Sequence, residues 1–180
     1  KVIETLWKDH PEYERIFSVE GKQKCLQDIE YHILYLAEAV GVESQQLFNN
    51  YLGWVKVLFV SLGIPEESFL ESLTTLRSII VNIVEHDEAE YISSYLDQGI
   101  ADFPNMPSSY GTALGPDNPL YKSATLYLSA LLEGNRDAAS KIIFEQIEND
   151  IDIKDIYLSI FQAVQIEIGR LWQMNRISVA

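Results

Sequence analysis

Apolar residues recur at steps of three and four along most of the chain, and this helical period constrains the fold more than any other feature. One such face is formed by Leu26, Ile29, Ile33, Leu36 and Val40. A half-buried strand would instead alternate apolar and polar residues, and no convincing alternation of that kind occurs in the sequence. We therefore predict an all-α fold that is built from helical bundles.

The first 104 residues are predicted to form a four-helix unit. One expected helix carries the apolar face at residues 26–40, and the next spans 43–62. The third has Pro65 in its first turn and continues to Ile83, and the fourth spans 87–103. The second helix carries two adjacent apolar stripes, which predicts burial over much of its circumference. In the fourth helix, Tyr91, Tyr95 and Leu96 are expected to face the core.

A segment rich in turn-forming residues then interrupts the helical pattern. Four prolines and two glycines lie between Pro104 and Pro119, which predicts a linker loop at residues 105–118. Three further helices are expected beyond it, at residues 120–132, 137–148 and 153–174. The domain prediction is thus a helical bundle at 1–104 and a second bundle at 119–180 that lacks its last helix. The missing N-terminal Met and the abrupt end lead us to expect a fragment of a longer protein.

Charge and apolar runs exclude several classes of partner. Residues 1–104 hold seven Lys and Arg against 18 Asp and Glu, a net charge of −11 out of −14 for the whole chain. Because nucleic-acid binding relies on clustered Lys and Arg, we expect no nucleic-acid contact by this segment. No apolar run approaches the roughly 20 residues of a membrane span, and no signal-peptide pattern is present. With a single cysteine, the chain fits a reducing compartment, and we expect a cytoplasmic protein without membrane contact.

The histidines and the cysteine do not form a recognisable catalytic or metal-binding set. His10, His32 and His86 lack the spacing that would place two imidazoles on one metal ion. A heme ligand is conceivable at His86, but the charged residues of a helix start explain this position better. We expect His32 to be a partly buried or surface histidine. Two lysines near Cys25 make a lowered thiol pKa conceivable, although an ordinary helical cysteine is the stronger interpretation.

Aromatic residues in the second helix offer one further candidate site. Tyr51 and Trp54 could stack on a ligand, although aromatic residues at helical spacing more often belong to a core. No Gly-rich phosphate loop is present, and paired carboxylates carry no information in so acidic a chain. We expect neither catalytic residues nor an enzyme activity.

Two motifs in the last third of the chain resemble a known family. Residues 126–139 read LYLSALLEGNRDAA, and residues 165–180 read QIEIGRLWQMNRISVA. Both are similar to the helical module that precedes the Rossmann-like cobalamin-binding domain in cobalamin-dependent methionine synthases, corrinoid methyltransferase proteins and B12-dependent light-sensing regulators. The second motif is the more specific of the two.

The resemblance implies that residues 119–180 cap the upper axial face of a corrin. Trp172 matches the tryptophan that lies over this face in the light-sensing members, and Val179 matches a small apolar neighbour in the same cap. Gly169, one turn before the tryptophan, would let another surface approach closely. The family's Glu-His pair would follow Ala180, and its Asp-x-His-x-x-Gly lower-ligand motif does not occur in this sequence. We therefore expect cobalamin to bind only together with a following domain outside this chain.

Three functions compete on this basis. The first is the N-terminal helical part of a cobalamin-binding regulatory or sensory protein, active in signalling or transcription regulation. The second is a corrinoid methyl carrier of a methyltransferase system. The third is a cofactor-free all-α interaction or dimerisation module. The additional N-terminal bundle favours the regulator, with that bundle as a sensory or dimerisation module, and a homodimer is expected if both apolar stripes of the second helix prove exposed.

Overall fold

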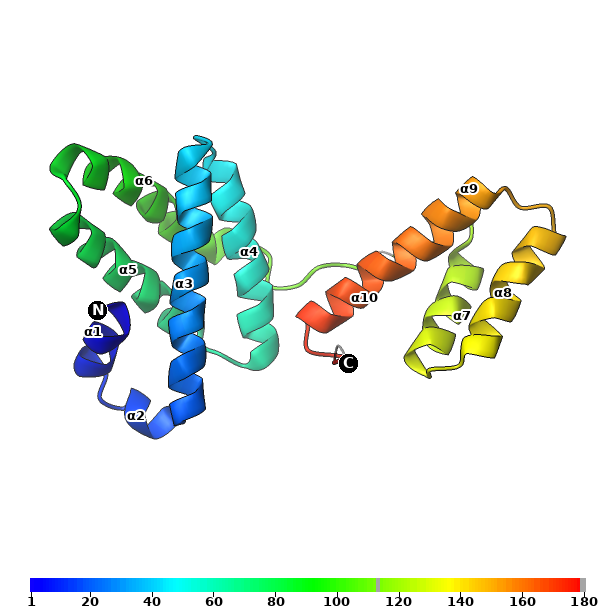
Figure 1. Ribbon diagram of the computed structural model, residues 1–180, viewed down its shortest axis with the longest axis horizontal. Helices are drawn as coiled ribbons and strands as arrows, with labels where there is room; N and C mark the ends of the chain where they lie inside the picture. The colour runs from blue at the N-terminus through cyan, green and yellow to red at the C-terminus, as the bar shows by residue number, and fades with distance from the viewer. Residues whose placement is uncertain (113, 179–180) are drawn as a thin grey trace. The chain divides into compact units, whose positions relative to one another are not determined.

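The computed structural model describes residues 1–112 and 114–178, and the regular structure in this part of the chain is helical (Figure 1). The all-α prediction is therefore confirmed. The chain divides into two compact units, Lys1–Ser108 and Ser109–Ala180. No helix among the described residues has both the length and the apolar character that a membrane crossing requires.

The N-terminal unit contains six α-helices and a short 3-10 turn. Their bounds are α1 (Val2–Asp9), α2 (Tyr13–Ile16), α3 (Val19–Gly41), α4 (Gln45–Leu62), α5 (Glu66–Ile83), α6 (His86–Asp102) and η1 (Phe103–Asn105). The four long helices correspond to those expected from the sequence. The helices α1 and α2 were not predicted, because eight and four residues are too short to show a clear helical period.

Helix α4 supplies much of the core of this unit, as its two apolar stripes predict. Phe48, Leu52 and Val55 are buried on it. Helix α6 approaches α4 closely at Gly99, where an added Cβ would lie 2.6 Å from Leu52 Cδ1. Leu47 and Trp54 on the other side of α4 are each 37% exposed, so one stripe is buried and the two stripes are not both exposed, which was the condition set for a dimer through this helix.

Two details of the predicted helix faces are wrong. On α6, Tyr95 and Leu96 are buried, but Tyr91 is 47% exposed. On α3, the buried face is rotated from the predicted stripe, so that Leu26 and Ile33 are exposed at its edge. The residues buried on α3 are Ile29, His32, Leu36 and Ala39. The predicted stripe contained only large apolar residues, whereas the observed buried face also includes the polar His32 and the small Ala39. This difference accounts for the rotation.

The C-terminal unit is built from a helical hairpin and one long helix. Its elements are α7 (Tyr121–Leu132), α8 (Arg136–Glu148), α9 (Ile153–Ile156), the π-helical turn η2 (Tyr157–Gln162) and α10 (Ala163–Gln173). The last three are continuous along the chain and correspond to the long helix expected at 153–174. Their core residues Ile156, Ile160 and Val164 are buried together with Ala124 of α7.

Part of the segment expected as a linker belongs structurally to this unit. Leu114 is buried in the core of the C-terminal unit. The side-chain amide of Asn118 donates a hydrogen bond of 2.7 Å to the backbone carbonyl of Ser159. Residues from Ser109 onward are therefore grouped with the C-terminal helices.

Candidate functional site

The end of α10 has a well-defined backbone geometry around Trp172. Asn175 adopts a left-handed conformation with φ of 52°. The N–H of Arg176 donates to the carbonyl of Leu171 at 2.8 Å, and the N–H of Asn175 donates to the carbonyl of Trp172 at 2.9 Å. This pattern is a Schellman motif, in which hydrogen bonds satisfy the last carbonyls of a helix. The motif fixes the direction in which the chain leaves the helix beside Trp172.

One face of the long helix exposes apolar side chains, and we call it the α10 face. Leu158, Ile166 and Trp172 on it are 50%, 56% and 43% exposed. Gly169 lies between them, and an added Cβ there would meet no atom within 4 Å. The α10 face therefore combines exposed apolar groups with a position where another flat surface can approach the backbone.

An ion pair anchors the opposite side of α10. The guanidinium of Arg170 donates to both carboxylate oxygens of Glu167, from Nε at 2.9 Å and from Nη2 at 2.6 Å. It also donates to the carbonyl of Tyr110 at 3.2 Å and contacts Met174 Sδ at 3.0 Å. The hydrogen bond to Glu167 raises the pKa of Arg170. Glu167 is only 4% exposed, so the ion pair is largely shielded from solvent. The hydrogen bond from Arg170 to the Tyr110 carbonyl ties the last turns of α10 to the segment that precedes α7.

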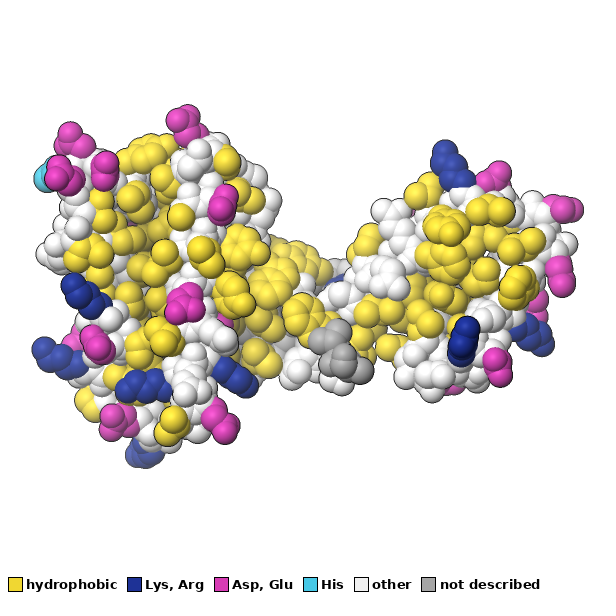
Figure 2. All heavy atoms as spheres, viewed as in Figure 1, with side chains coloured by type: hydrophobic (Ala, Val, Ile, Leu, Met, Phe, Trp, Pro, Cys, Tyr) yellow, Lys and Arg dark blue, Asp and Glu magenta, His cyan; other side chains and the backbone are white. Residues whose placement is uncertain are grey.

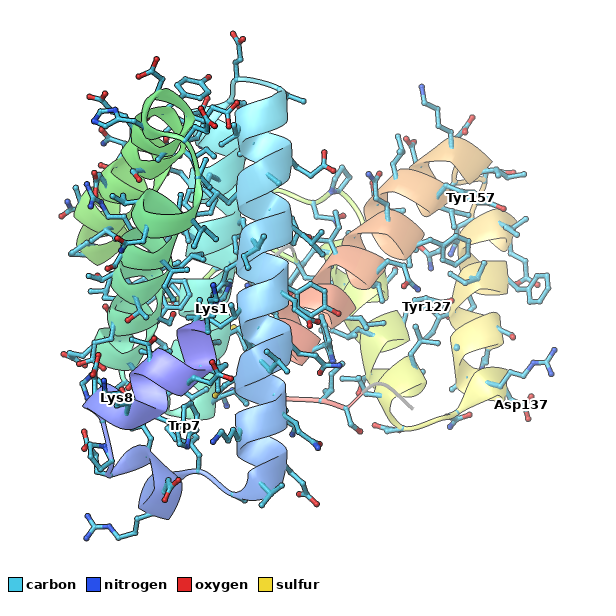
Figure 3. All side chains as sticks on the ribbon, turned by 60° about the vertical axis from the view of Figure 1, so that its left-hand side comes forward. Lys1, Trp7, Lys8, Tyr127, Asp137 and Tyr157 are labelled. Atoms are coloured by element: carbon cyan, nitrogen blue, oxygen red, sulfur yellow. The ribbon has the colours of Figure 1, made fainter. Side chains whose placement is uncertain are left out.

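A second apolar surface of the C-terminal unit lies along α7 and α8. A groove of about 430 Å³ is lined by Tyr127, Leu131, Ile143 and Phe144, together with Phe161 of η2. The ring of Phe161 packs against both tyrosines labelled in this region of Figure 3, at 5.5 Å from Tyr127 and 5.2 Å from Tyr157. Hydrophobic side chains are also plainly visible on this unit in Figure 2. Such uncovered apolar area is typical of a surface that contacts a ligand or another protein surface.

In the N-terminal unit, His32 is a fully buried histidine rather than a partly buried or surface one. Its Nδ1 lies 2.5 Å from the hydroxyl of Tyr51, and its ring packs edge-on against Phe69. Burial lowers the pKa of His32 to about 4, so the imidazole is neutral at pH 7. Tyr51 stacks on Tyr35 of α3 with ring centroids 4.0 Å apart. Tyr51 is thus a core residue, while Trp54 is 37% exposed.

Cys25 lines a small internal cavity of about 70 Å³ with Trp7 and Phe69 among its other walls. Burial, with a contribution from Asp28, raises the pKa of its thiol, so the idea of a lowered pKa is wrong. This volume is about half of the roughly 150 Å³ of an engineered cavity that binds benzene. His86 is fully solvated in the first turn of α6, 3.6 Å from the carboxylate of Asp87.

Comparison with known proteins relates the two units to different families. Residues 3–103, more than half of the chain, match the model of the phycobilisome proteins. The chain belongs to the phycobilisome protein family. The allophycocyanin alpha-B chain of Cyanophora paradoxa is 23% identical to this phycobilisome-family chain over 106 residues, which is 54% of the chain. The chain spans 65% of the length of that relative. No solved structure matches the chain significantly.

The C-terminal unit of this phycobilisome-family chain has a separate match. Residues 124–180 match the model of a B12 binding domain. This finding supports the resemblance noted from the sequence, whereas the relationship of residues 3–103 was not anticipated. The match contains Trp172, on the α10 face, and Val179, which lies outside the described residues.

The described part of the α10 face combines exposed apolar side chains with two exposed glutamines at the same helical spacing, Gln162 and Gln165. Its exposed side chains Leu158, Ile166 and Trp172 are uncharged and apolar, and Gly169 leaves the backbone open. Among the residues that the structure describes, no group of three or more His, Cys, Asp or Glu could hold a metal ion. The sequence contains no Asp-x-His-x-x-Gly motif, which is the family's lower axial ligand motif.

Proposed function

We propose that the C-terminal unit caps the upper axial face of cobalamin in a regulatory or sensory cobalamin-binding protein. The proposal depends on one coincidence. The segment that matches a B12 binding domain is the segment in which Trp172 and Gly169 form an exposed face. A cobalamin cap requires such a face, because it must exclude water from the corrin without coordinating the metal.

Four residues on the two sides of α10 have distinct parts in this role. Trp172 supplies a broad apolar ring that excludes water from the bound cofactor. Gly169 removes the side chain that would otherwise hold the corrin away from the helix. Glu167 and Arg170 act as positioning residues, since their ion pair fixes the turns that carry Trp172. Cobalamin itself supplies the light-sensitive or methyl-transferring Co–C bond.

We further propose that the chain has a binding rather than a catalytic role, and that its N-terminal unit is a sensory or dimerisation module. Support for an added module comes from the family membership of residues 3–103, which lie outside the B12 domain match. Sedimentation of the purified chain tests self-association: a single monomeric species over a wide concentration range would refute the dimerisation role.

The cap is tested with the native protein that carries this chain. The protein is mixed in the dark with adenosylcobalamin or methylcobalamin and separated from free ligand, and its visible spectrum and photolysis rate are recorded. We expect retained corrin, and a changed spectrum or faster photolysis after Trp172→Ala. Phe144→Ala is the matched control, because Phe144 is an aromatic residue of the same unit that is 62% exposed and lies on α8.

The two negative outcomes have different meanings. Failure of the native protein to retain any corrin would refute the cobalamin role and favour a cofactor-free interaction module. Retained corrin with identical spectra and photolysis rates in Trp172→Ala and Phe144→Ala would refute the cap assignment of the α10 face alone.

A further inference from the structure

The N-terminal unit carries a surface pocket that neither family match explains. It lies along α3 and α4 and has a volume of about 230 Å³. Aromatic side chains dominate its walls, with Tyr31 and Tyr35 from α3 and Tyr51 and Trp54 from α4. Tyr31 and Tyr35 are 54% and 44% exposed, so solvent reaches the pocket. The face-to-face stack of Tyr35 on Tyr51 makes one wall rigid.

A carboxylate stands in this aromatic pocket without a close partner. Asp28 lines the pocket and is partly buried, yet within the described residues it makes no hydrogen bond and no ion pair within 4 Å. Burial raises its pKa, with an opposing electrostatic effect from Lys24. A poorly solvated carboxylate is costly unless something pairs with it. The same carboxylate contributes to the raised pKa of the Tyr51 phenol.

The surroundings add little positive charge to offset Asp28. The buried floor of the pocket is His32, which is neutral at pH 7. The ammonium group of Lys56, also on α4, donates to the carbonyls of Phe103 and Pro104 and pairs with a carboxylate of α5. Residues 25–55 contain no Lys or Arg. The pocket therefore has a negative potential, within a unit whose first 104 residues carry a net charge of −11.

We propose that this pocket binds an alkylammonium group, with Asp28 as its counter-ion and the tyrosine rings as its walls. Aromatic faces carry negative quadrupole charge and attract cations that lie over them, and a partly desolvated carboxylate strengthens the same preference. Neutral ligands of equal shape gain the apolar contact but not the electrostatic attraction. Anionic ligands are repelled. The proposal does not depend on cobalamin binding by the C-terminal unit.

The test compares a cation with its neutral isostere on the full chain. Choline and 3,3-dimethylbutan-1-ol have the same shape and differ in charge, and each is titrated at pH 8 and constant ionic strength while tyrosine and tryptophan fluorescence is recorded. We expect saturable binding of choline that is at least tenfold tighter than that of the alcohol. Tetramethylammonium and Nα-acetyl-lysine amide distinguish a free quaternary ammonium from a peptide-borne ammonium as the ligand source.

Two variants assign the binding to this pocket. Asp28→Asn should weaken choline binding at least tenfold, whereas Glu30→Gln, which removes an exposed carboxylate on the same helix outside the pocket, should not. Asp28→Asn is expected to fold at least as well as the parent, because it removes a desolvated charge. Equal affinity for choline and the alcohol, or an unchanged affinity in folded Asp28→Asn, would overturn the proposal.

Discussion

Two helical glycines should respond in opposite ways to the same substitution. Gly169 in α10 faces open space, since an added Cβ meets no atom within 4 Å. Gly99 in α6 faces the core, where the added Cβ would lie 2.6 Å from Leu52 Cδ1 and 3.1 Å from Phe48 Cε1. Both Leu52 and Phe48 are fully buried and have little room to move. Alanine substitutions at the two positions therefore measure separately how helix propensity and core packing affect stability.

The expected magnitudes follow from these surroundings. Gly169→Ala should stabilise the C-terminal unit by about 0.5–1 kcal/mol, because alanine loses less conformational entropy on forming a helix. Gly99→Ala gains the same amount but overpacks the core at a cost of about 1–3 kcal/mol. The net effect on the N-terminal unit should be a destabilisation of up to about 2.5 kcal/mol. If the α10 face caps a corrin, Gly169→Ala should also weaken cobalamin retention by the native protein.

Hydrogen exchange measured by mass spectrometry can follow the two units separately. Peptides from α10 in Gly169→Ala should exchange about two- to fivefold more slowly, which corresponds to 0.5–1 kcal/mol. Peptides from α4 and α6 in Gly99→Ala should exchange faster, and those from the C-terminal unit should not change. Faster exchange of α10 in Gly169→Ala would show that this glycine is packed, and would refute the open face on which the cap proposal depends.

Four further substitutions probe buried or half-buried polar groups by urea unfolding. The pKa of His32 falls from 6.5 to about 4 on folding, so between pH 7 and pH 5 only the unfolded chain protonates this imidazole. The free energy of unfolding should therefore fall by about 2 kcal/mol over this pH range, and His32→Gln should remove this pH dependence. Lys56→Met should cost about 1–3 kcal/mol, because two backbone carbonyls lose their donor. Arg170→Gln should cost about 2 kcal/mol by leaving Glu167 without its ion pair, and the added change Glu167→Gln should recover about half of that loss.

Helical periodicity was sufficient to predict the long helices, because a helix buried along one side repeats its apolar residues every three or four positions. It failed where other forces decide which face is buried. On α3, His32 is buried through its hydrogen bond to Tyr51 and Ala39 through its small size, so the buried face is rotated away from Leu26. Tyr91 was predicted to face the core, but it is 47% exposed, and its hydroxyl lies 3.2 Å from that of Tyr95.

The candidate sites differ in how far sequence could reveal them. Gly169 and Trp172 lie on one helix, and the local motif that contains them was enough to propose them as a site, which stays a prediction. The pocket of the N-terminal unit joins Asp28 and Tyr31 of α3 to Tyr51 of α4, and their proximity depends on how the helices pack. One signal was available on each helix. On α4 it was the pair Tyr51 and Trp54, which was named from the sequence as a candidate for ligand stacking. On α3 it was a stripe at spacing three and four formed by Asp28, Tyr31 and Tyr35, but acidic residues are too common in this chain for that stripe to stand out.

Both proposed sites contain a residue that lowers the stability of the fold. Glycine at position 169 weakens a helix without relieving any clash. The carboxylate of Asp28 is partly desolvated without a hydrogen bond or close ion pair among the described residues. Selection for stability alone would favour alanine at the first position and a neutral side chain at the second. A residue that destabilises the free protein is explained when it contacts a bound ligand. The proposed corrin would contact Gly169, and the proposed alkylammonium group would contact Asp28, at independent places in the chain.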